Sequence, residues 1–443
     1  MQEAGSLLVK LLEKQKVDRV FCVPGESYLS VMNGLQETSI ETILCKHEGA
    51  ASMMAEADGK LTGRPGIAFV TRGPGATNAA SGIHIAQQDS TPMILFVGQI
   101  GKEMYGRDAF QEVDYQQFYG GMAKLVIEVQ QSDRLSEIFS RAYHTAMSGR
   151  PGPVIIALPE NMLTEKTDKK PLEFIDQLMS APTTKDLAQF IEEIKEAKNP
   201  IVVLGGSIWS HEAEKDLISI SEMLGLTIIT SHRRQSYYNN LHKNYGGDLG
   251  LGVNPKLINR INNSDYLVLL GGRLSENPSQ GFTLLGIPEH NKKFIHIHPG
   301  SEEIGRIYKP HLGIVSNPIA FVNILNNALK GLNTKPNSNN ELNAVKSHEE
   351  YIEWGDMPLE APNSGVDLTS AFRTLRKHLD PNTIITNGAG NYAVWGHRLF
   401  RFTKVKTQLA PISGSMGYGL PAAIAAKLRF PDNMVIALAG DGC

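Results

Sequence analysis

The sequence predicts an α/β protein in which parallel sheets are flanked by helices, arranged as three consecutive domains. Its 443 residues are enough for about three domains of roughly 150 residues each. Short apolar segments alternate with stretches of helical spacing along the chain, and this alternation is typical of a mostly parallel sheet. Two polar stretches, at about 160–187 and 332–357, stand where linkers between domains are expected.

The first domain is expected over residues 1–165. Residues 6–16 carry apolar side chains at helical spacing and lead into a strand at 19–23. Helix-like stretches separate the later strands, so the predicted sheet is mostly parallel. These later strands are expected at 67–71, 93–97 and 154–158.

The second and third domains are expected over residues 186–332 and 358–443. Both continue the alternation of strands with other segments, and the third carries a glycine-rich turn between its two strands. The third is shorter than the roughly 100–150 residues of a typical α/β domain, so we expect it to be incomplete. The strands are expected at 201–204, 227–230, 266–270 and 294–298 in the second domain, and at 383–386 and 434–439 in the third.

The composition argues against several classes of protein. A net charge of −3 and sparse aromatic residues give no sign of a nucleic-acid-binding surface. The sequence has no apolar run of the ~18 residues that a membrane span needs, and its N-terminus does not resemble a signal peptide. We therefore expect a cytoplasmic protein that binds neither nucleic acid nor membranes.

The three cysteines, Cys22, Cys45 and Cys443, lack the spacing of metal ligands, and we expect reduced thiols. Cys22 lies at a predicted strand end, where a small buried side chain is a better interpretation than a reactive thiol. His296 and His298 share one face of a predicted strand. They could form a metal pair, but no third ligand is near them in the sequence, so a structural role is favoured.

The last residues predict half of a magnesium site. A strand at 434–439, expected to be buried, leads into the turn Gly440-Asp441-Gly442-Cys443. Small residues in such a turn let backbone N–H groups approach a phosphate, while the carboxylate of Asp441 suits a hard cation. Because Mg²⁺ is usually held by one or two carboxylates with phosphates and water, we expect a further ligand beyond Cys443 and a truncated protein.

Glu48 stands at the predicted start of a helix, just after a short strand at 41–45. The small residues that follow it indicate close packing, and a partly buried carboxyl group there is suited to proton transfer. The alternative is a solvated glutamate that interacts with the helix dipole. The local sequence leaves both interpretations open.

Three glycine-rich turns follow predicted strands or lie near them: 73–78, 388–391 and 413–419. Ligands of open α/β folds bind at the carboxyl ends of strands, but each segment could also be a plain turn. Met416 stands between glycines, where methionine usually fills a gap. None of the three has the glycine spacing of a dinucleotide-binding fingerprint.

Five motifs follow one another along the chain: Lys-His-Glu-Gly-Ala-Ala (46–51), Gly-Pro-Gly-Ala-Thr-Asn (73–78), Asp-Ala-Phe-Gln-Glu (108–112), Gly-Ser-Met-Gly-Tyr-Gly-Leu-Pro (414–421) and Gly-Asp-Gly (440–442). Together, in this order, they resemble the thiamine-diphosphate enzymes of the acetolactate synthase type, over essentially the whole chain. The resemblance implies the three-domain thiamine-diphosphate-enzyme architecture: a pyrimidine-binding domain, a central Rossmann-like domain and a diphosphate-binding domain, the last incomplete.

The resemblance implies a role for each matched residue. Glu48 would bond the aminopyrimidine ring of the cofactor and relay its proton, while the carbonyl of Gly414 would accept from the amino group. Met416 would hold the cofactor in a bent shape, and Asp441 would bind Mg²⁺. The other expected cofactor contacts are Asn78, Ala389, Gly390, Asn391, Tyr392, Gly440, Gly442 and Cys443, and the expected substrate-side residues are Phe110, Gln111 and Lys124.

The implied activity is decarboxylation of a 2-oxo acid, with or without carboligation to an acceptor, by a lyase or transferase. In the family, Glu48 and Asp441 serve one cofactor from different subunits, which implies a homodimer or homotetramer. A flavin-containing oxidase on the same scaffold, or a noncatalytic scaffold subunit, are the alternatives. We expect residues 1–443 alone to lack activity, because the second metal ligand is missing.

Two departures from the family argue against acetolactate production and FAD. Asn277 aligns with an arginine that recruits the second oxo acid in the synthase. Arginine pairs with a carboxylate through two parallel hydrogen bonds, and asparagine cannot. The Gly-Met-His-Gly stretch of the synthase is also absent, since residues 245–250 read Tyr-Gly-Gly-Asp-Leu-Gly. We therefore expect a related decarboxylase or carboligase with a different acceptor.

Overall fold

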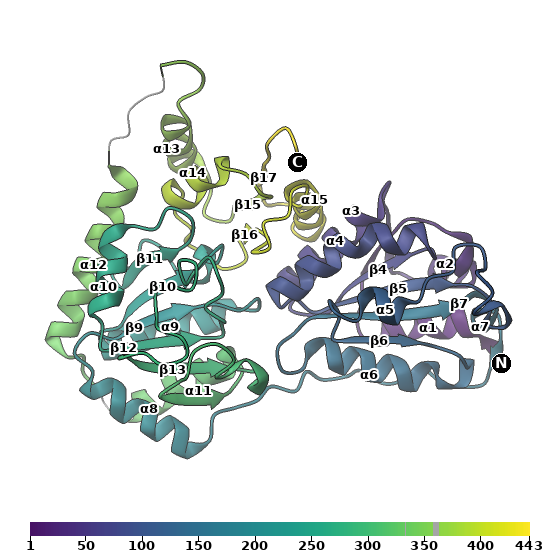
Figure 1. Ribbon diagram of the computed structural model, residues 1–443, viewed down its shortest axis with the longest axis horizontal. Coiled ribbons are helices and arrows are strands. Elements are labelled where there is room, and N and C mark those ends of the chain that lie inside the picture. The colour runs from purple at the N-terminus through teal and green to yellow at the C-terminus, as the bar shows by residue number, and fades with distance from the viewer. Residues whose placement is uncertain (333, 358–362) are drawn as a thin grey trace. The chain divides into compact units, whose positions relative to one another are not determined.

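The computed structural model describes residues 1–332, 334–357 and 363–443 and divides into two compact units. Unit 1 contains Met1–Leu178 and Pro411–Pro431, and unit 2 contains Met179–Ala410 and Asp432–Cys443. Each unit has a six-stranded parallel sheet with helices packed against it, so the predicted α/β class is confirmed (Figure 1).

The sheet of unit 1 has the strand order β3-β2-β4-β5-β7-β6, and every neighbouring pair is parallel. The strands predicted in this part of the chain are confirmed to within two residues. A separate antiparallel pair joins β1 to β8. The bounds are β1 (Gln2–Glu3), β2 (Arg19–Cys22), β3 (Glu41–Leu44), β4 (Gly66–Val70), β5 (Met93–Gln99), β6 (Leu125–Glu128), β7 (Pro153–Pro159) and β8 (Lys166–Thr167).

Helices cover both faces of this sheet. One core joins α1, α2 and α6 to alternate strand residues, while α3 and α4 lie on the other side of the sheet (Figure 1). β4 and β5 are buried along their whole length, as expected of central strands covered on two faces. The bounds are α1 (Ala4–Lys14), α2 (Leu29–Gln36), α3 (Glu48–Thr62), α4 (Pro74–Asp89), α5 (Tyr115–Tyr119), α6 (Leu135–Met147), α7 (Glu160–Leu163) and α15 (Gly419–Arg429), the last packed on α3.

The large sheet of unit 2 has the order β11-β10-β9-β12-β13-β14, and all its pairs are parallel. The chain reverses direction across the sheet between β9 and β12, which is the topology of a doubly wound Rossmann-like sheet. The bounds are β9 (Ile201–Leu204), β10 (Thr227–Ser231), β11 (Tyr245–Leu249), β12 (Tyr266–Leu270), β13 (Lys293–His298) and β14 (Leu312–Val315), with α8 (Thr184–Glu196), α9 (His211–Leu224), α10 (Pro255–Asn263) and α11 (Pro318–Gly331).

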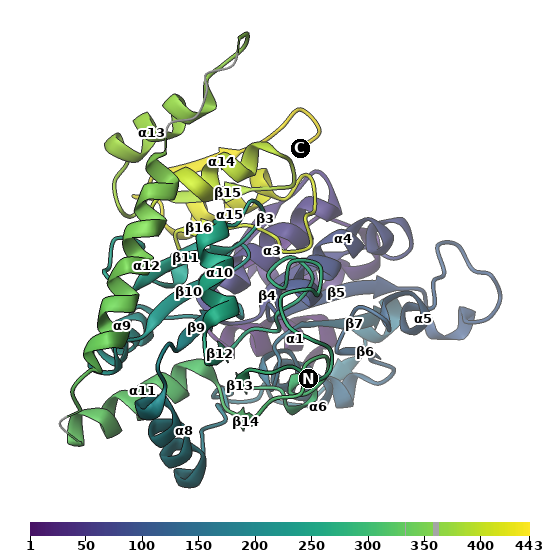
Figure 2. The same cartoon turned by 60° about the vertical axis from the view of Figure 1, so that its left-hand side comes forward.

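The linker predicted at 332–357 is wrong, because most of it forms α12 (Ser338–Asp356), which runs along β10 and β11 (Figure 2). The side chain of Asn337 caps the helix by accepting from the N–H of Asn339. Its buried face carries Ala344, Ser347 and Tyr351 at helical spacing, so small and polar residues hide an amphipathic pattern. The earlier linker is present, since 168–183 contains neither helix nor strand.

A small parallel sheet, β16-β15-β17, represents the third predicted domain. The expectation of a buried last strand is wrong: β17 is only partly covered, and Met434 is 56% exposed. The reason is its position, since β17 is an edge strand among the described residues. The bounds are β15 (Ile384–Asn387), β16 (Gln408–Leu409) and β17 (Val435–Leu438), with α13 (Leu368–His378) and α14 (Tyr392–Leu399).

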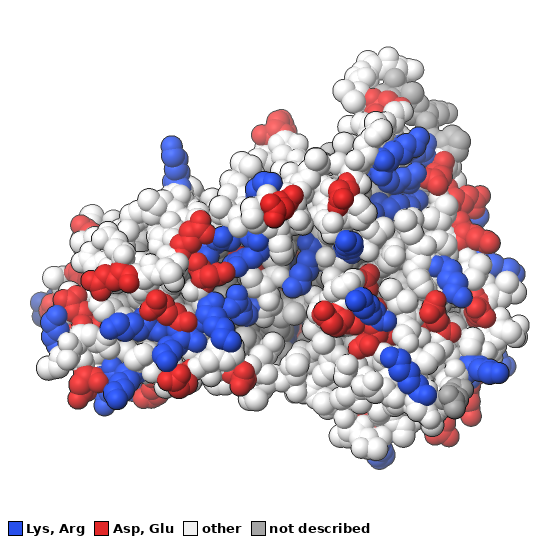
Figure 3. Space-filling model, turned by 180° about the vertical axis from the view of Figure 1, so that it is seen from behind, with Lys and Arg blue, Asp and Glu red and all other residues white. Residues whose placement is uncertain are grey.

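Acidic and basic side chains are interspersed over the face drawn in Figure 3. Within the described ranges, no helix combines the length and the apolar character needed to cross a membrane. The prediction that the protein does not bind nucleic acid stays a prediction.

Candidate functional site

Glu48 is the first residue of α3 and follows the carboxyl end of β3. His47 caps the helix, because its Nδ1 accepts from the backbone N–H of Gly49 at 3.0 Å. The side chain of Glu48 is half-buried, and its Oε2 accepts from Nδ2 of Asn78 at 3.0 Å. Two residues of the predicted site, which come from different helices, therefore contact each other directly.

The turn from Gly73 to Gly75 lies beside this carboxylate, at the carboxyl end of β4. A Cβ on Gly75 would lie only 3.3 Å from Oε1 of Glu48, so glycine leaves space there. Gly73 has a φ of +58°, and a Cβ on it would lie 2.7 Å from Cβ of Gln111. The absence of side chains thus lets the turn contact both Glu48 and the loop that carries Gln111.

The loop with Phe110 and Gln111 is held by its own carboxylate. Glu112 accepts from the backbone N–H groups of Gly106 at 2.7 Å and Ala109 at 2.9 Å, and these bonds lower the pKa of Glu112. Gln111 adopts a left-handed backbone conformation, and Phe110 is 75% exposed. The loop therefore presents an apolar ring to solvent next to the Gly73 turn.

Lys124 does not lie with this group in the chain, and its role as a substrate-side residue stays a prediction. Its Nζ donates to the carbonyls of Thr145 and Ser148 at the end of α6, at 2.5 and 2.6 Å. Its backbone N–H bonds to Pro153 at the start of β7. Because all strands of the sheet are parallel, Lys124 lies at the amino-terminal edge, opposite the edge that carries Glu48.

A buried cluster of charges lies two turns further along α3, and the sequence analysis missed it. Nζ of Lys60 is 2.9 Å from Oε1 of Glu56 and also contacts the carboxylate of Asp89. The hydroxyl of Tyr418 donates to Oε2 of Glu56 at 2.7 Å. Burial raises the pKa of Glu56, and the ammonium of Lys60 opposes that shift. The only local signal was a Glu–Lys pair four residues apart in a helix of small and apolar residues.

Tyr418 belongs to the motif that contains Gly414 and Met416, so the cluster holds this segment against α3 within unit 1. Gly414 has a φ of +68°, and its N–H donates to the carbonyl of Pro411 at 3.1 Å. The side chain of Met416 is 58% exposed. The side chain of Met416 is therefore accessible to a ligand, and its role stays a prediction.

A second group of predicted residues comes together in unit 2, at the carboxyl ends of β15 and β17. Sγ of Cys443 lies 3.5 Å from the carbonyl oxygen of Ala389 and 3.6 Å from the hydroxyl of Tyr392. Gly440 also lies against the ring of Tyr392, because a Cβ there would be 3.4 Å from Cε1. The turns 388–391 and 440–443 are thus neighbours, as the parallel pairing of the two strands requires.

The chemistry of these turns fits a diphosphate with a divalent cation. Asp441 is exposed, and one of its oxygens accepts from the N–H of Gly442 at 3.0 Å. A single accessible carboxylate, completed by phosphate and water oxygens, matches the way Mg²⁺ is commonly held. In the described part of the chain, no group of three or more His, Cys, Asp or Glu side chains could hold a metal by itself.

The other singled-out residues have structural roles. His296 bonds the carbonyl of Gly272 at 3.0 Å, and His298 bonds the backbone of Gly300. Cys22 is buried, as expected of a small filler side chain, and burial raises the pKa of its thiol to about 11. Glycine is needed at position 205, at the switch point of the Rossmann-like sheet, because a Cβ there would lie only 2.5 Å from Cα of Gly272.

Three family models of thiamine pyrophosphate (thiamine diphosphate) enzymes match the chain. They are the N-terminal TPP binding domain over residues 2–118, the central domain over 187–325 and the C-terminal TPP binding domain over 388–443. The chain belongs to this family, and it is a thiamine-diphosphate-dependent enzyme of the class that decarboxylates or carboligates 2-oxo acids. The third domain is present, and its predicted incompleteness and the predicted domain boundaries stay predictions.

Several curated relatives of the chain are acetolactate synthase large subunits. It is 30% identical to a probable acetolactate synthase large subunit from Methanococcus aeolicus, over 98% of this chain and 75% of that protein. It is 29% identical to the acetolactate synthase large subunit of Corynebacterium glutamicum, over 98% of this chain and 70% of that protein. It is 28% identical to the acetolactate synthase large subunit of Lactococcus lactis subsp. lactis, over 99% of this chain and 76% of that protein. The predicted resemblance is confirmed, while the roles of single residues stay predictions.

Proposed function

We propose that this protein is a lyase or transferase that decarboxylates a 2-oxo acid, using thiamine diphosphate and Mg²⁺. The single observation that carries the proposal is the pairing of Glu48 with Asn78 beside the glycine turn at Gly75. A half-buried carboxylate at a helix start, oriented by an amide and bordered by a glycine turn, is suited to hold or transfer a proton on a ligand ring.

The chain's own residues would divide the work in a defined way. Thiamine diphosphate, when bound, supplies the carbanion chemistry. Glu48 would bond the pyrimidine ring and move its proton, and Asn78 would fix the direction of that carboxylate. The carbonyl of Gly414 would accept from the ring's amino group, and the exposed side chain of Met416 would support the cofactor from below. Phe110 and Gln111 would border the substrate.

Asp441 and the turn 389–392 would hold the metal and the diphosphate, together with Gly440, Gly442 and Cys443. Support comes from the way the two turns meet at the carboxyl ends of parallel strands, with an accessible carboxylate between glycines. We also propose a homodimer or homotetramer in which Glu48 and Asp441 of different subunits serve one cofactor. Sedimentation velocity of the native protein tests the assembly, and a monomer at micromolar concentration contradicts it.

The acceptor differs from that of acetolactate synthase in this proposal. Asn277 replaces a guanidinium that binds the carboxylate of a second oxo acid, and asparagine offers no charge for that purpose. We expect little acetolactate from pyruvate and no bound FAD. Rapid, saturable formation of acetolactate, or a yellow protein with a flavin spectrum after purification, would contradict this part.

The central experiment measures CO₂ release from a panel of 2-oxo acids by the native protein. The release should require both thiamine diphosphate and Mg²⁺, and Glu48→Gln should lower its rate by about a hundredfold or more, because proton transfer contributes about 10²–10⁴-fold in enzymes. A wild-type rate no higher than that of Glu48→Gln would sink the proposal. CO₂ release that consumes oxygen would favour the oxidase instead.

A further inference from the structure

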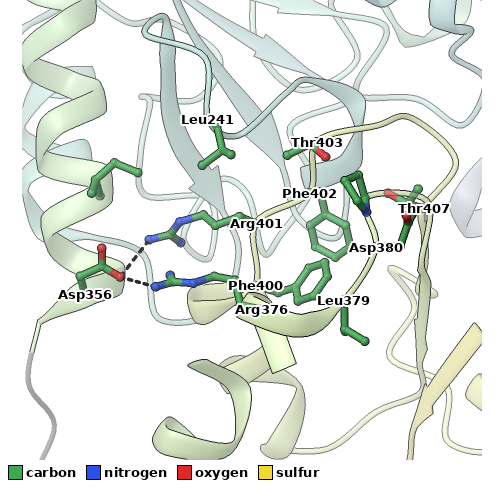
Figure 4. Close-up of a pocket in the computed structure, with 12 residues that line it drawn as sticks. Leu241, Asp356, Arg376, Leu379, Asp380, Phe400, Arg401, Phe402, Thr403 and Thr407 are labelled. Atoms are coloured by element: carbon green, nitrogen blue, oxygen red, sulfur yellow. Dashed lines mark hydrogen bonds and ion pairs between the residues drawn. The ribbon is translucent and has the colours of Figure 1, made fainter. Parts of the chain in front are cut away.

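Unit 2 contains a cavity of about 450 Å³ that shares no lining residue with the groups described above (Figure 4). Its volume lies within the ~300–1,000 Å³ range of small-molecule sites. Much of its wall is apolar, and two guanidinium groups also line it (Figure 4). The apolar wall is formed by Leu241, Ile352, Leu379, Pro381, Phe400 and Phe402.

Arg401 gives this cavity a buried cationic donor. Its side chain is only 5% exposed, and its Nη1 donates to the hydroxyl of Tyr351 and the carbonyl of Arg398 at 3.2 and 3.0 Å. Its Nη2 is shielded from solvent and has no hydrogen-bond partner among the described residues. Gly355 makes room for this group, since a Cβ there would lie 2.0 Å from Nη2. A buried charged donor without a partner is costly, and a bound acceptor would remove that cost.

Arg376 and Arg401 share one nearby carboxylate. Oδ1 of Asp356 is 2.8 Å from Arg376 but 3.9 Å from Arg401, so one carboxylate serves two guanidiniums (Figure 4). Asp380 also borders the cavity, but its Oδ1 accepts from the backbone and side chain of Asn382, and the residue is exposed. The two carboxylates and two guanidiniums of the lining therefore balance in number, but Arg401 lacks a close carboxylate partner, which a bound carboxylate would supply.

We propose that this cavity binds a small monocarboxylate with an apolar body, such as a branched or aromatic acid. Its carboxylate would pair with the guanidinium groups of Arg401 and Arg376, and its body would pack on Phe400 and Phe402. Guanidinium groups recognise carboxylates through directional, charge-assisted hydrogen bonds. A phosphate dianion fits less well, because it meets the carboxylate of Asp356 and leaves the apolar wall uncovered.

The test is calorimetric titration of the purified chain with 4-methylpentanoate, which is unreactive toward decarboxylation. The acid should bind saturably. The alcohol 4-methylpentan-1-ol, which has the same carbon skeleton without the charge, should bind at least about tenfold more weakly. Acetate should also bind more weakly, since it lacks the apolar body. Inorganic phosphate should not compete. Absence of saturable binding, equal binding of the alcohol, or competition by phosphate overturns the proposal.

Variants place the ligand in the cavity. Arg376→Gln and Arg401→Lys should each weaken binding about tenfold, and Leu379→Trp should block the cavity while leaving both arginines in place. Lys377→Gln is the matched control, because it removes one positive charge from the same helix at an exposed position outside the lining. If Arg401→Lys does not fold, Arg376→Gln and Leu379→Trp decide. Unchanged affinity in these two, or equal loss in Lys377→Gln, overturns the assignment.

Discussion

The side-chain amide of Asn78 donates a hydrogen bond to the carboxylate of Glu48, with 3.0 Å between Nδ2 and Oε2. The two residues stand in the first turns of α4 and α3, each just after a strand of the same parallel sheet. The bond fixes one carboxylate oxygen and leaves the other beside Gly75, where a side chain is absent. The sheet edge thus presents one oriented carboxylate to a ligand.

Asn78→Ala should reduce kcat of the proposed decarboxylation by about tenfold and leave the fold intact. The exposed amide contributes little to stability, but its loss frees the Glu48 side chain to rotate, and a misplaced group costs catalysis. Steady-state rates with a thermal melt of each variant check this. The loss should be smaller than in Glu48→Gln, because the carboxylate itself remains. A rate equal to wild type would show that Asn78 does not orient Glu48.

Gly73→Ala should lower both stability and activity. A Cβ at this left-handed position costs about 1–2 kcal/mol, and it would push on Gln111 from 2.7 Å. We expect a lower melting temperature and a kcat/KM reduced by about tenfold. Gly281→Ala is the matched control, since its φ of +68° is also positive while nothing lies within 4 Å of the new atom. Equal losses of activity in both variants would exclude displacement of Gln111 as the cause.

Local motifs predicted the parts of the site that lie on single turns, and missed the parts that depend on distant contacts. Glu48 and the Gly73 turn are recognisable because strand, turn and helix follow each other directly. The contact of Tyr418 with Glu56 joins residues far apart in the sequence, and no local pattern specifies it. The position of Lys124 at the amino-terminal sheet edge was also not predictable, because the sequence does not show at which edge the strand that follows it begins.

In the fold too, local patterns were predictable and features that depend on distant contacts were not. Strand positions were predictable because apolar runs of the right length are buried on both faces of parallel sheets. The helix α12 was missed because its buried face uses residues such as Asn340, Ala344 and Ser347, whose weak hydrophobicity hides the helical period. The edge position of β17 was not predictable, because burial of a strand depends on which neighbours pair with it.

Lys60→Met should destabilise unit 1 by about 3–5 kcal/mol, because it leaves the carboxylates of Glu56 and Asp89 buried without their shared cation. Chemical denaturation followed by circular dichroism measures the effect. Lys10→Met is the control, since this exposed lysine only bonds the side chain of Gln2 and should change little. The double variant Lys60→Met with Glu56→Gln should recover part of the loss. A change in Lys60→Met no larger than in Lys10→Met would show that the cluster does not stabilise the fold.

Asp248 should make the stability of unit 2 fall as the pH rises. It lies in β11, in the stretch that departs from the synthase, and burial raises its pKa to about 7. Gln235 donates to it at 3.2 Å, and burial lowers the pKa values of the nearby His232 and His397, which favours their neutral forms.

Between about pH 4 and pH 7 the folded protein therefore holds a proton on Asp248 that the unfolded chain has lost, and stability declines through this window and is lowest above it.

Asp248→Asn keeps the hydrogen bond without the charge. The melting temperature of Asp248→Asn should exceed that of wild type by a margin that widens by several degrees from pH 5 to pH 8, as the stability difference grows by about 2–3 kcal/mol. Thermal melts of both proteins from pH 5 to 8 measure the difference, and groups that titrate alike in both cancel. Asp432→Asn, at an exposed position, should show no such trend. A gap between Asp248→Asn and wild type that stays constant or shrinks toward pH 8 would mean that Asp248 is ionised in the folded protein throughout this range.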